Sequence, residues 1–172
     1  MVDQARFMLC LADQPRAMLI FSPALGVPAD YYNTFAQTLA QQGLSVSVNE
    51  LRGNGTSPVR ASRKVDFGYA ELINEDLRSV VKWAQKNFND LKLLLGGHSL
   101  GGHLAFLYKA KYDLGVQGLV LVASSLPYFR VYPFWQSAQI LVASFMFKVA
   151  TLAMGYLPGR WVGFGHREAR TP

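Results

Sequence analysis

The sequence has little that could cross-link the chain or bind a metal. Cys10 is its single cysteine, and only three histidines are present among 172 residues. One cysteine cannot form an internal disulfide and does not suggest a metal cluster, so we expect no metal and no cofactor. The same scarcity is typical of proteins from a reducing compartment. Charged residues make up 16% and hydrophobic residues 51% of the chain, which excludes a disordered protein and indicates a globular one.

Targeting and nucleic-acid signals are also missing. The first apolar run, residues 7–12, ends at Asp13 and is shorter than the roughly 7–15 residues of a secretory signal. We therefore expect a cytoplasmic protein. The net charge of +6 could attract anionic partners. Because the basic residues are scattered and lack interleaved aromatics, we do not expect nucleic-acid binding.

Short apolar runs alternate along the chain with longer segments of helical periodicity. This alternation predicts an α/β fold with a doubly wound, mostly parallel sheet, whose functional loops lie at the carboxyl ends of the strands. The first strand should turn at residues 13–15 directly into the second, and residues 50–67 should form a long loop. We expect strands at 7–11, 17–21, 44–48, 91–95 and 116–122, and helices at 30–42, 69–88 and 100–111.

The character of the chain changes after Pro127. Residues 140–157 are almost entirely apolar and are long enough to span a membrane, but Lys148 in their middle would cost several kcal/mol there. We therefore predict an α/β core at 1–127, followed at 128–172 by a hydrophobic helical cap or lid segment. A membrane-spanning helix remains the alternative, and contact with a membrane surface is conceivable through 134–157.

The run Gly97-His98-Ser99-Leu100-Gly101 carries the clearest chemical signal. It follows an apolar strand and opens a helix, which is the context in which a G-x-S-x-G serine stands exposed on a strained turn. Small residues lie where the backbone and the helix must approach closely. The pattern therefore favours Ser99 as a nucleophile. A glycine-rich turn that binds an anion through free N–H groups is the alternative.

This run resembles the nucleophile elbow of the α/β-hydrolase superfamily. Two more segments match in order and spacing: FSPALG at 21–26 lies where many members have His-Gly-x-Gly, and ELRGNGTS at 50–57 resembles Asp-x-Arg-Gly-x-Gly-x-Ser. Within the superfamily, the sequence resembles bacterial predicted hydrolases that are grouped with serine-aminopeptidase-like and monoacylglycerol-lipase-like enzymes. The resemblance implies an incomplete α/β-hydrolase fold and hydrolysis of a small-molecule acyl ester or amide through an acyl-enzyme.

The resemblance also implies roles for individual residues. The N–H groups of Leu25 and Leu100 would hold the oxyanion, with Ala24 as an alternative to Leu25. Pro23 replaces a family histidine and has no N–H. Ala24, Gly26 and His98 would contact the substrate, and Glu50 would shape its loop together with Arg52 rather than take part in catalysis.

The partners that would activate Ser99 are harder to find. The family order places an acid and then a histidine after the serine, but only His103 and His166 follow it. We expect His103 on the flank of its helix, His166 in a loop, and Asp76 and Asp113 as ordinary surface acids. The simplest hypothesis is that the chain is the front portion of a longer hydrolase and is inactive or weakly active as it stands. A non-catalytic binding module and an acyltransferase or thioesterase on the same scaffold remain alternatives.

Overall fold

The computed structural model describes residues 6–60, 64–112, 115–124 and 128–154. Over these residues one five-stranded sheet has the order β1-β3-β2-β4-β5. The strand β1 is antiparallel to β3, and all other neighbours are parallel. The predicted α/β fold with a mostly parallel sheet is therefore confirmed. The strands are β1 (Phe7–Cys10), β2 (Ala17–Ser22), β3 (Leu44–Asn49), β4 (Lys92–His98) and β5 (Val116–Val122).

The two strands on either side of the turn at 13–15 are not neighbours in the sheet. β1 lies beside β3, with Phe7 opposite Asn49, whereas β2 lies between β3 and β4. The start of β2 is tied to the turn before β3, because the Arg16 N–H donates to the Gly43 carbonyl at 2.9 Å. Residues 18–22 are buried throughout, so β2 takes a central position with a parallel neighbour on each side.

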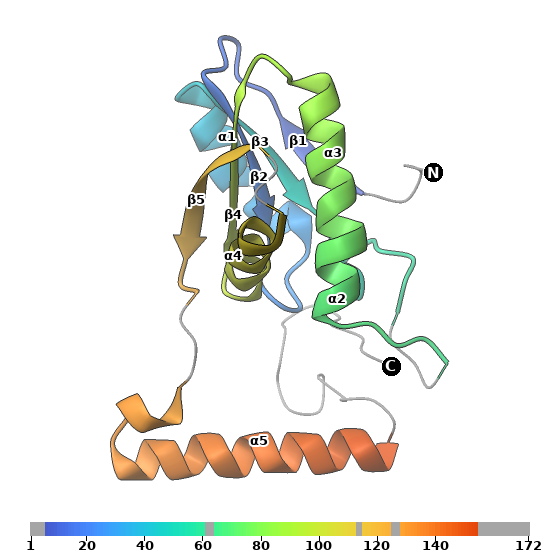
Figure 1. The fold of residues 1–172 in the computed structure, drawn as a ribbon, viewed down its shortest axis with the longest axis vertical. Helices are drawn as coiled ribbons and strands as arrows, with labels where there is room; N and C mark the ends of the chain where they lie inside the picture. The colour runs from blue at the N-terminus through green and yellow to red at the C-terminus, as the bar shows by residue number, and fades with distance from the viewer. Residues whose placement is uncertain (1–5, 61–63, 113–114, 125–127, 155–172) are drawn as a thin grey trace.

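Helices cover both faces of the sheet (Figure 1). On one face, Leu19 and Phe21 pack with the turn η1 (Ala29–Tyr32) and the helix α1 (Asn33–Gln41). On the other face, Met18 and Ile20 pack against the second group of helices. The alternation of β2 side chains thus builds two cores and confirms the doubly wound arrangement. The second group consists of α2 (Tyr69–Glu71), η2 (Leu72–Leu77), α3 (Arg78–Asn87) and α4 (Leu100–Tyr112).

The helix predicted at 69–88 contains a π-helical turn, η2, that receives a side chain from the long loop. The Arg52 guanidinium donates to both Asp76 carboxylate oxygens through Nε, at 3.0 and 2.8 Å, and to Glu75 at 2.8 Å. These hydrogen bonds, chiefly the one to Asp76, raise the pKa of Arg52. Asp76 is therefore not the ordinary surface acid that we expected, because it anchors the 50–60 loop to the helix.

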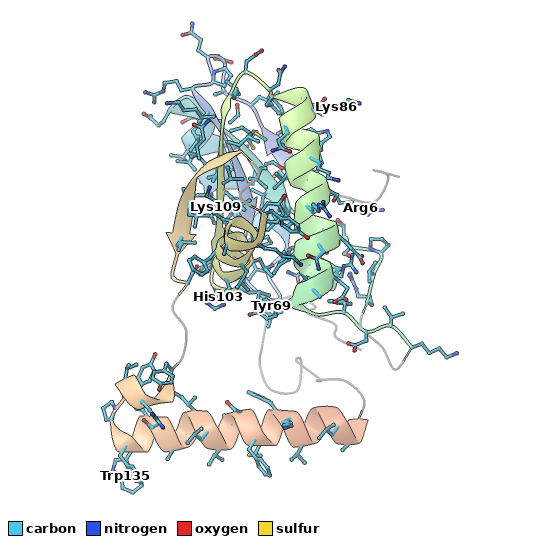
Figure 2. All side chains as sticks on the ribbon, viewed as in Figure 1. Arg6, Tyr69, Lys86, His103, Lys109 and Trp135 are labelled. Carbon is cyan, nitrogen blue, oxygen red and sulfur yellow. The ribbon has the colours of Figure 1, made fainter. Side chains whose placement is uncertain are left out.

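The C-terminal apolar segment forms the turn η3 (Phe129–Val131) and the helix α5 (Phe134–Met154), which begins six residues before the predicted apolar run at 140. The helix lies beyond the carboxyl ends of the strands, apart from the sheet, and Trp135 at its start points away from the sheet (Figures 1 and 2). Phe134 and Trp135 are each 77% exposed. Within the described parts of the chain, no helix has both the length and the apolar character to cross a membrane.

We expect Gly101→Ala to destabilise the protein strongly. A Cβ on Gly101 would overlap the Ser22 carbonyl oxygen, and backbone atoms cannot move aside cheaply. Urea denaturation should show a loss of about 3 kcal/mol in the free energy of unfolding, at the upper end of typical overpacking costs. Gly68→Ala is the control, since its Cβ would meet only Glu71 Oε2, at 3.9 Å. Equal stability of the two variants would contradict the close contact.

Candidate active site

Ser99 is the single residue between the end of β4 and the start of α4, and its backbone has a conformation that few non-glycine residues adopt. Its φ is +52°, and its side chain is half-buried. The backbone holds this geometry on both sides: the Ser99 N–H donates to the Val122 carbonyl at 2.9 Å, and its carbonyl accepts from Gly102 N–H at 3.1 Å. Such strain, of order 1–3 kcal/mol, concentrates at functional sites.

The glycines on either side of Ser99 are required by close backbone contacts. A Cβ on Gly97 would overlap the Gly101 carbonyl group, and one on Gly101 would overlap the end of β2 at Ser22. These positions therefore bring the strand, the turn and the helix of the elbow together as the sequence pattern predicts. The Leu100 N–H, in the first turn of α4, has no acceptor within the described segments.

The loop after β2 forms a tight turn from Ala24 to Val27. The Val27 N–H donates to the Ala24 carbonyl at 3.1 Å, and Gly26 has a φ of +75°, as the third residue of a type II turn requires. The Ala24 N–H donates to the Tyr32 hydroxyl at 3.0 Å, and the Gly26 N–H donates to Asn54 Oδ1 at 3.2 Å. In the part of the chain that the structure describes, Leu25 N–H alone of these four has no acceptor, and Leu25 is 60% exposed.

Asn54 holds this turn from the long loop. Its Oδ1 accepts from the Gly26 N–H, and its Nδ2 donates to the Ala24 carbonyl at 3.4 Å and to the Val27 carbonyl at 3.2 Å. The residue is only 4% exposed. Sequence reasoning missed Asn54, because it occupies the variable position between the two glycines of the Arg-Gly-x-Gly motif, and the pattern says nothing of what an amide there would contact.

Tyr32 links the same turn to the elbow. Its hydroxyl lies 2.9 Å from His98 Nδ1, and the two rings meet edge to face. Burial raises the pKa of Tyr32, so the hydroxyl keeps its proton at neutral pH. Tyr32 falls within the helix predicted at 30–42, and the periodicity that predicts this helix reports burial and not hydrogen bonding. His98, predicted as a substrate contact, is thereby placed beside Ser99 with one ring nitrogen engaged.

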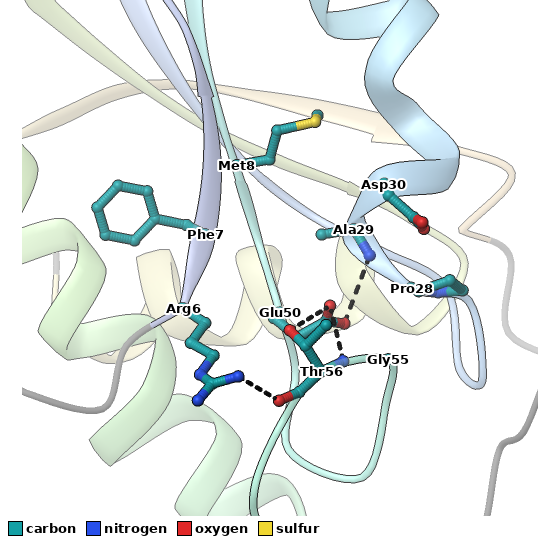
Figure 3. Close-up of a pocket in the computed structure, with 9 residues that line it drawn as sticks. All are labelled: Arg6, Phe7, Met8, Pro28, Ala29, Asp30, Glu50, Gly55 and Thr56. Atoms are coloured by element: carbon teal, nitrogen blue, oxygen red, sulfur yellow. Dashed lines mark hydrogen bonds between the residues drawn. The ribbon is translucent and has the colours of Figure 1, made fainter.

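Glu50 contacts its own loop and the start of η1. Its carboxylate accepts from the Ala29 N–H at 3.4 Å and from the Thr56 N–H and hydroxyl at 3.3 and 3.4 Å (Figure 3). Burial raises the pKa of Glu50. These contacts agree with the expectation that Glu50 shapes the loop. Glu50 also lines a pocket of about 600 Å³ beside β1, and none of the elbow residues lines that pocket.

The histidines after Ser99 do not provide a base in the described structure. His103 Nε2 lies 3.2 Å from the Ser124 carbonyl, so this ring is engaged with the loop after β5. His166, Asp113 and Glu168 lie outside the described residues. Among the residues that are described, no group of three or more His, Cys, Asp or Glu side chains could hold a metal ion.

Known proteins resemble this chain in sequence. The model of the family described as serine aminopeptidase, S33, matches residues 13–162. The chain is 29% identical over 107 residues to a monoacylglycerol lipase of Mycolicibacterium smegmatis and 30% identical over 128 residues to a proline iminopeptidase of Thermoplasma volcanium. These alignments cover 62% and 70% of this chain but only 37% and 40% of the relatives.

A solved structure supports the same fold. The thermostable carboxyl esterase of Bacillus coagulans, in complex with glycerol, superposes with a TM-score of 0.61 at 21% identity. The superposition covers 68% of this chain and 39% of the esterase. The similarity shows the α/β-hydrolase fold, and the matched part of the chain covers well under half the length of these relatives.

We expect Asn54→Ala to loosen the turn at 24–27. The substitution leaves the Gly26 N–H and two carbonyls without their buried partner, which should cost about 1–3 kcal/mol of unfolding free energy. Thermal and urea denaturation would measure this loss. Asn89→Ala, at an exposed position, is the control and should be neutral within about 0.5 kcal/mol. A neutral effect of Asn54→Ala would contradict the role of Asn54 in holding the turn.

Proposed function

Because the chain belongs to the serine aminopeptidase S33 family of α/β-hydrolases, we propose that it is a serine hydrolase that attacks a small-molecule ester or amide with Ser99. The observation that carries the proposal is the φ of +52° at Ser99, on a turn between a strand and a helix. The two N–H groups of Leu25 and Leu100, which have no acceptor in the described residues, support it further. The relatives include a monoacylglycerol lipase and a proline iminopeptidase, so esters and amides are both candidate substrates.

The proposed reaction begins with attack of Ser99 Oγ on the substrate carbonyl carbon. The C–O bond to the serine forms as the carbonyl becomes an oxyanion, which the Leu25 and Leu100 N–H groups stabilise. The leaving group then departs to give the acyl-enzyme, and water releases the acid. Ala24, Gly26 and His98 line the approach to Ser99 in this proposal, with Ala24 and Gly26 shaping the turn rather than donating.

The serine proton needs a base, and the described histidines are committed elsewhere. His98 Nδ1 meets the Tyr32 hydroxyl, and His103 Nε2 meets the Ser124 carbonyl. We therefore propose that the 172-residue chain is inactive or weakly active as it stands. The same observation favours the second candidate function, a non-catalytic module that keeps the fold and binds acyl ligands or a partner.

We propose that residues 1–127 form the α/β core and residues 128–172 a cap over the acyl-binding cleft. The exposed apolar side chains of α5 and its place beyond the carboxyl ends of the strands support this division. The same side chains would allow contact with a membrane surface through 134–157.

A fluorophosphonate probe tests the nucleophile. We expect slow labelling of the wild-type chain that disappears in Ser99→Ala and persists in Ser137→Ala, a matched change on α5. The rate should lie about three orders of magnitude or more below that of a hydrolase with a full triad. Labelling that survives Ser99→Ala would reject Ser99 as the nucleophile, and fast labelling would reject the proposed inactivity.

The oxyanion donor is tested by Leu25→Pro. Proline is favoured at the second position of a type II turn, so this change removes the N–H of Leu25 while the turn is kept. We expect the Ser99 labelling rate to fall about 100-fold, the usual cost of one oxyanion donor, with the melting temperature unchanged. Leu25→Ala keeps the N–H and should label like the wild type. Equal rates for the two variants would exclude Leu25 as a donor.

A further inference from the structure

We propose that the Tyr32 hydroxyl holds His98 in the Nε2–H tautomer. Nε2 of His98 is thereby a hydrogen-bond donor to the substrate. This inference rests on the proposed function, because it assigns a contact in the same site. It goes beyond that function by naming the group that sets the tautomer of His98 and the kind of substrate atom to which His98 would donate a hydrogen bond.

The direction of the hydrogen bonds follows from the donors available. Tyr32 has one O–H proton, and its oxygen already accepts the Ala24 N–H at 3.0 Å. Within the described residues, His98 Nδ1, at 2.9 Å, is the acceptor that this proton can reach. Tyr32 therefore donates to Nδ1, and the proton of the neutral imidazole resides on Nε2. The opposite direction would leave the buried O–H of Tyr32 without an acceptor, which is costly.

The surroundings keep this arrangement rigid. Tyr32 is 7% exposed, and its ring packs against Phe21 with centroids 5.4 Å apart. The His98 ring meets Tyr32 edge to face, with centroids 6.1 Å apart. The hydrogen-bond chain thus joins the turn at 24–27, the η1 turn and the elbow. Because the Tyr32 hydroxyl also accepts a hydrogen bond from the Ala24 N–H, Tyr32 is a positioning residue for the oxyanion donors as well as for His98.

In this proposal, Nε2 of His98 determines which substrates are favoured. His98 is half-buried, directly precedes Ser99, and its Nε2 has no partner within the described segments. As an N–H donor it would favour a substrate that presents an oxygen lone pair there, such as an ester oxygen or a hydroxyl on the alcohol portion. A substrate with an ammonium group at that place would be disfavoured, since two donors would face each other.

The tautomer can be observed directly in the full chain. Two-bond ¹H–¹⁵N correlation spectra of ¹⁵N-histidine-labelled protein, with the His98 signals identified from His98→Gln, should show that the proton of the singly protonated ring is on Nε2. Tyr32→Phe keeps the ring but removes the hydroxyl, and it should shift His98 to a mixture of tautomers. Tyr31→Phe, at a neighbouring side chain that is 73% exposed, should leave the spectrum unchanged. An Nδ1–H ring in the wild type, or an unchanged ring in Tyr32→Phe, would overturn the proposal.

The donor role is tested with the fluorophosphonate, whose oxygen atoms are acceptors. His98→Gln keeps an N–H donor and should label Ser99 about tenfold faster than His98→Leu, the ratio that about 1.4 kcal/mol provides. Equal rates for both variants would reject the donor role. If no variant is labelled at Ser99, the proposed nucleophile fails and the donor role falls with it, whereas the tautomer spectrum still decides whether Tyr32 sets the His98 proton.

Discussion

The close contact between Gly101 and the backbone of Ser22 and Pro23 is the constraint on which the site depends. It lets the first turn of α4 lie directly on the end of β2, which no side chain at position 101 would allow. As a result the turn at 24–27 and Ser99 share one edge of the sheet. Two N–H groups from segments about 75 residues apart in sequence, Leu25 and Leu100, are thereby brought to the same region. The parallel order of β2 and β4 provides the rest of this geometry, because their carboxyl ends coincide.

Two polar side chains then decide which donors remain free. Asn54 engages the Gly26 N–H and the carbonyls of Ala24 and Val27, and Tyr32 engages the Ala24 N–H. Both residues are buried, so these hydrogen bonds are shielded from water and hold the turn firmly. The Leu25 N–H lies at an exposed position and has no acceptor among the described residues, and such a group can stabilise a developing charge without rearrangement.

Charge stabilisation and proton removal are separate parts of this site. The strained serine and the free N–H groups are built entirely by the sheet, the turn and the first turn of α4. They do not depend on a base, and the described histidines serve other contacts: His98 with Tyr32 and His103 with Ser124. In the function that we propose, this geometry would bind an acyl group and its oxyanion even where turnover is slow, so the hydrolase and the binding-module hypotheses rest on the same site.

The sequence by itself determined the fold class, the positions of the five strands and the elbow around Ser99. Hydrophobic periodicity reports which face of each element is buried, and the glycines at 97 and 101 report where backbones meet. Periodicity carries no information on which strands become neighbours, so only the tertiary structure decided that β1 pairs with β3. It also cannot show polar contacts between distant segments. The structure alone therefore revealed Asn54 on the turn, Tyr32 on His98 and Arg52 on Asp76, whose partners lie 24–66 residues away in sequence but meet in space.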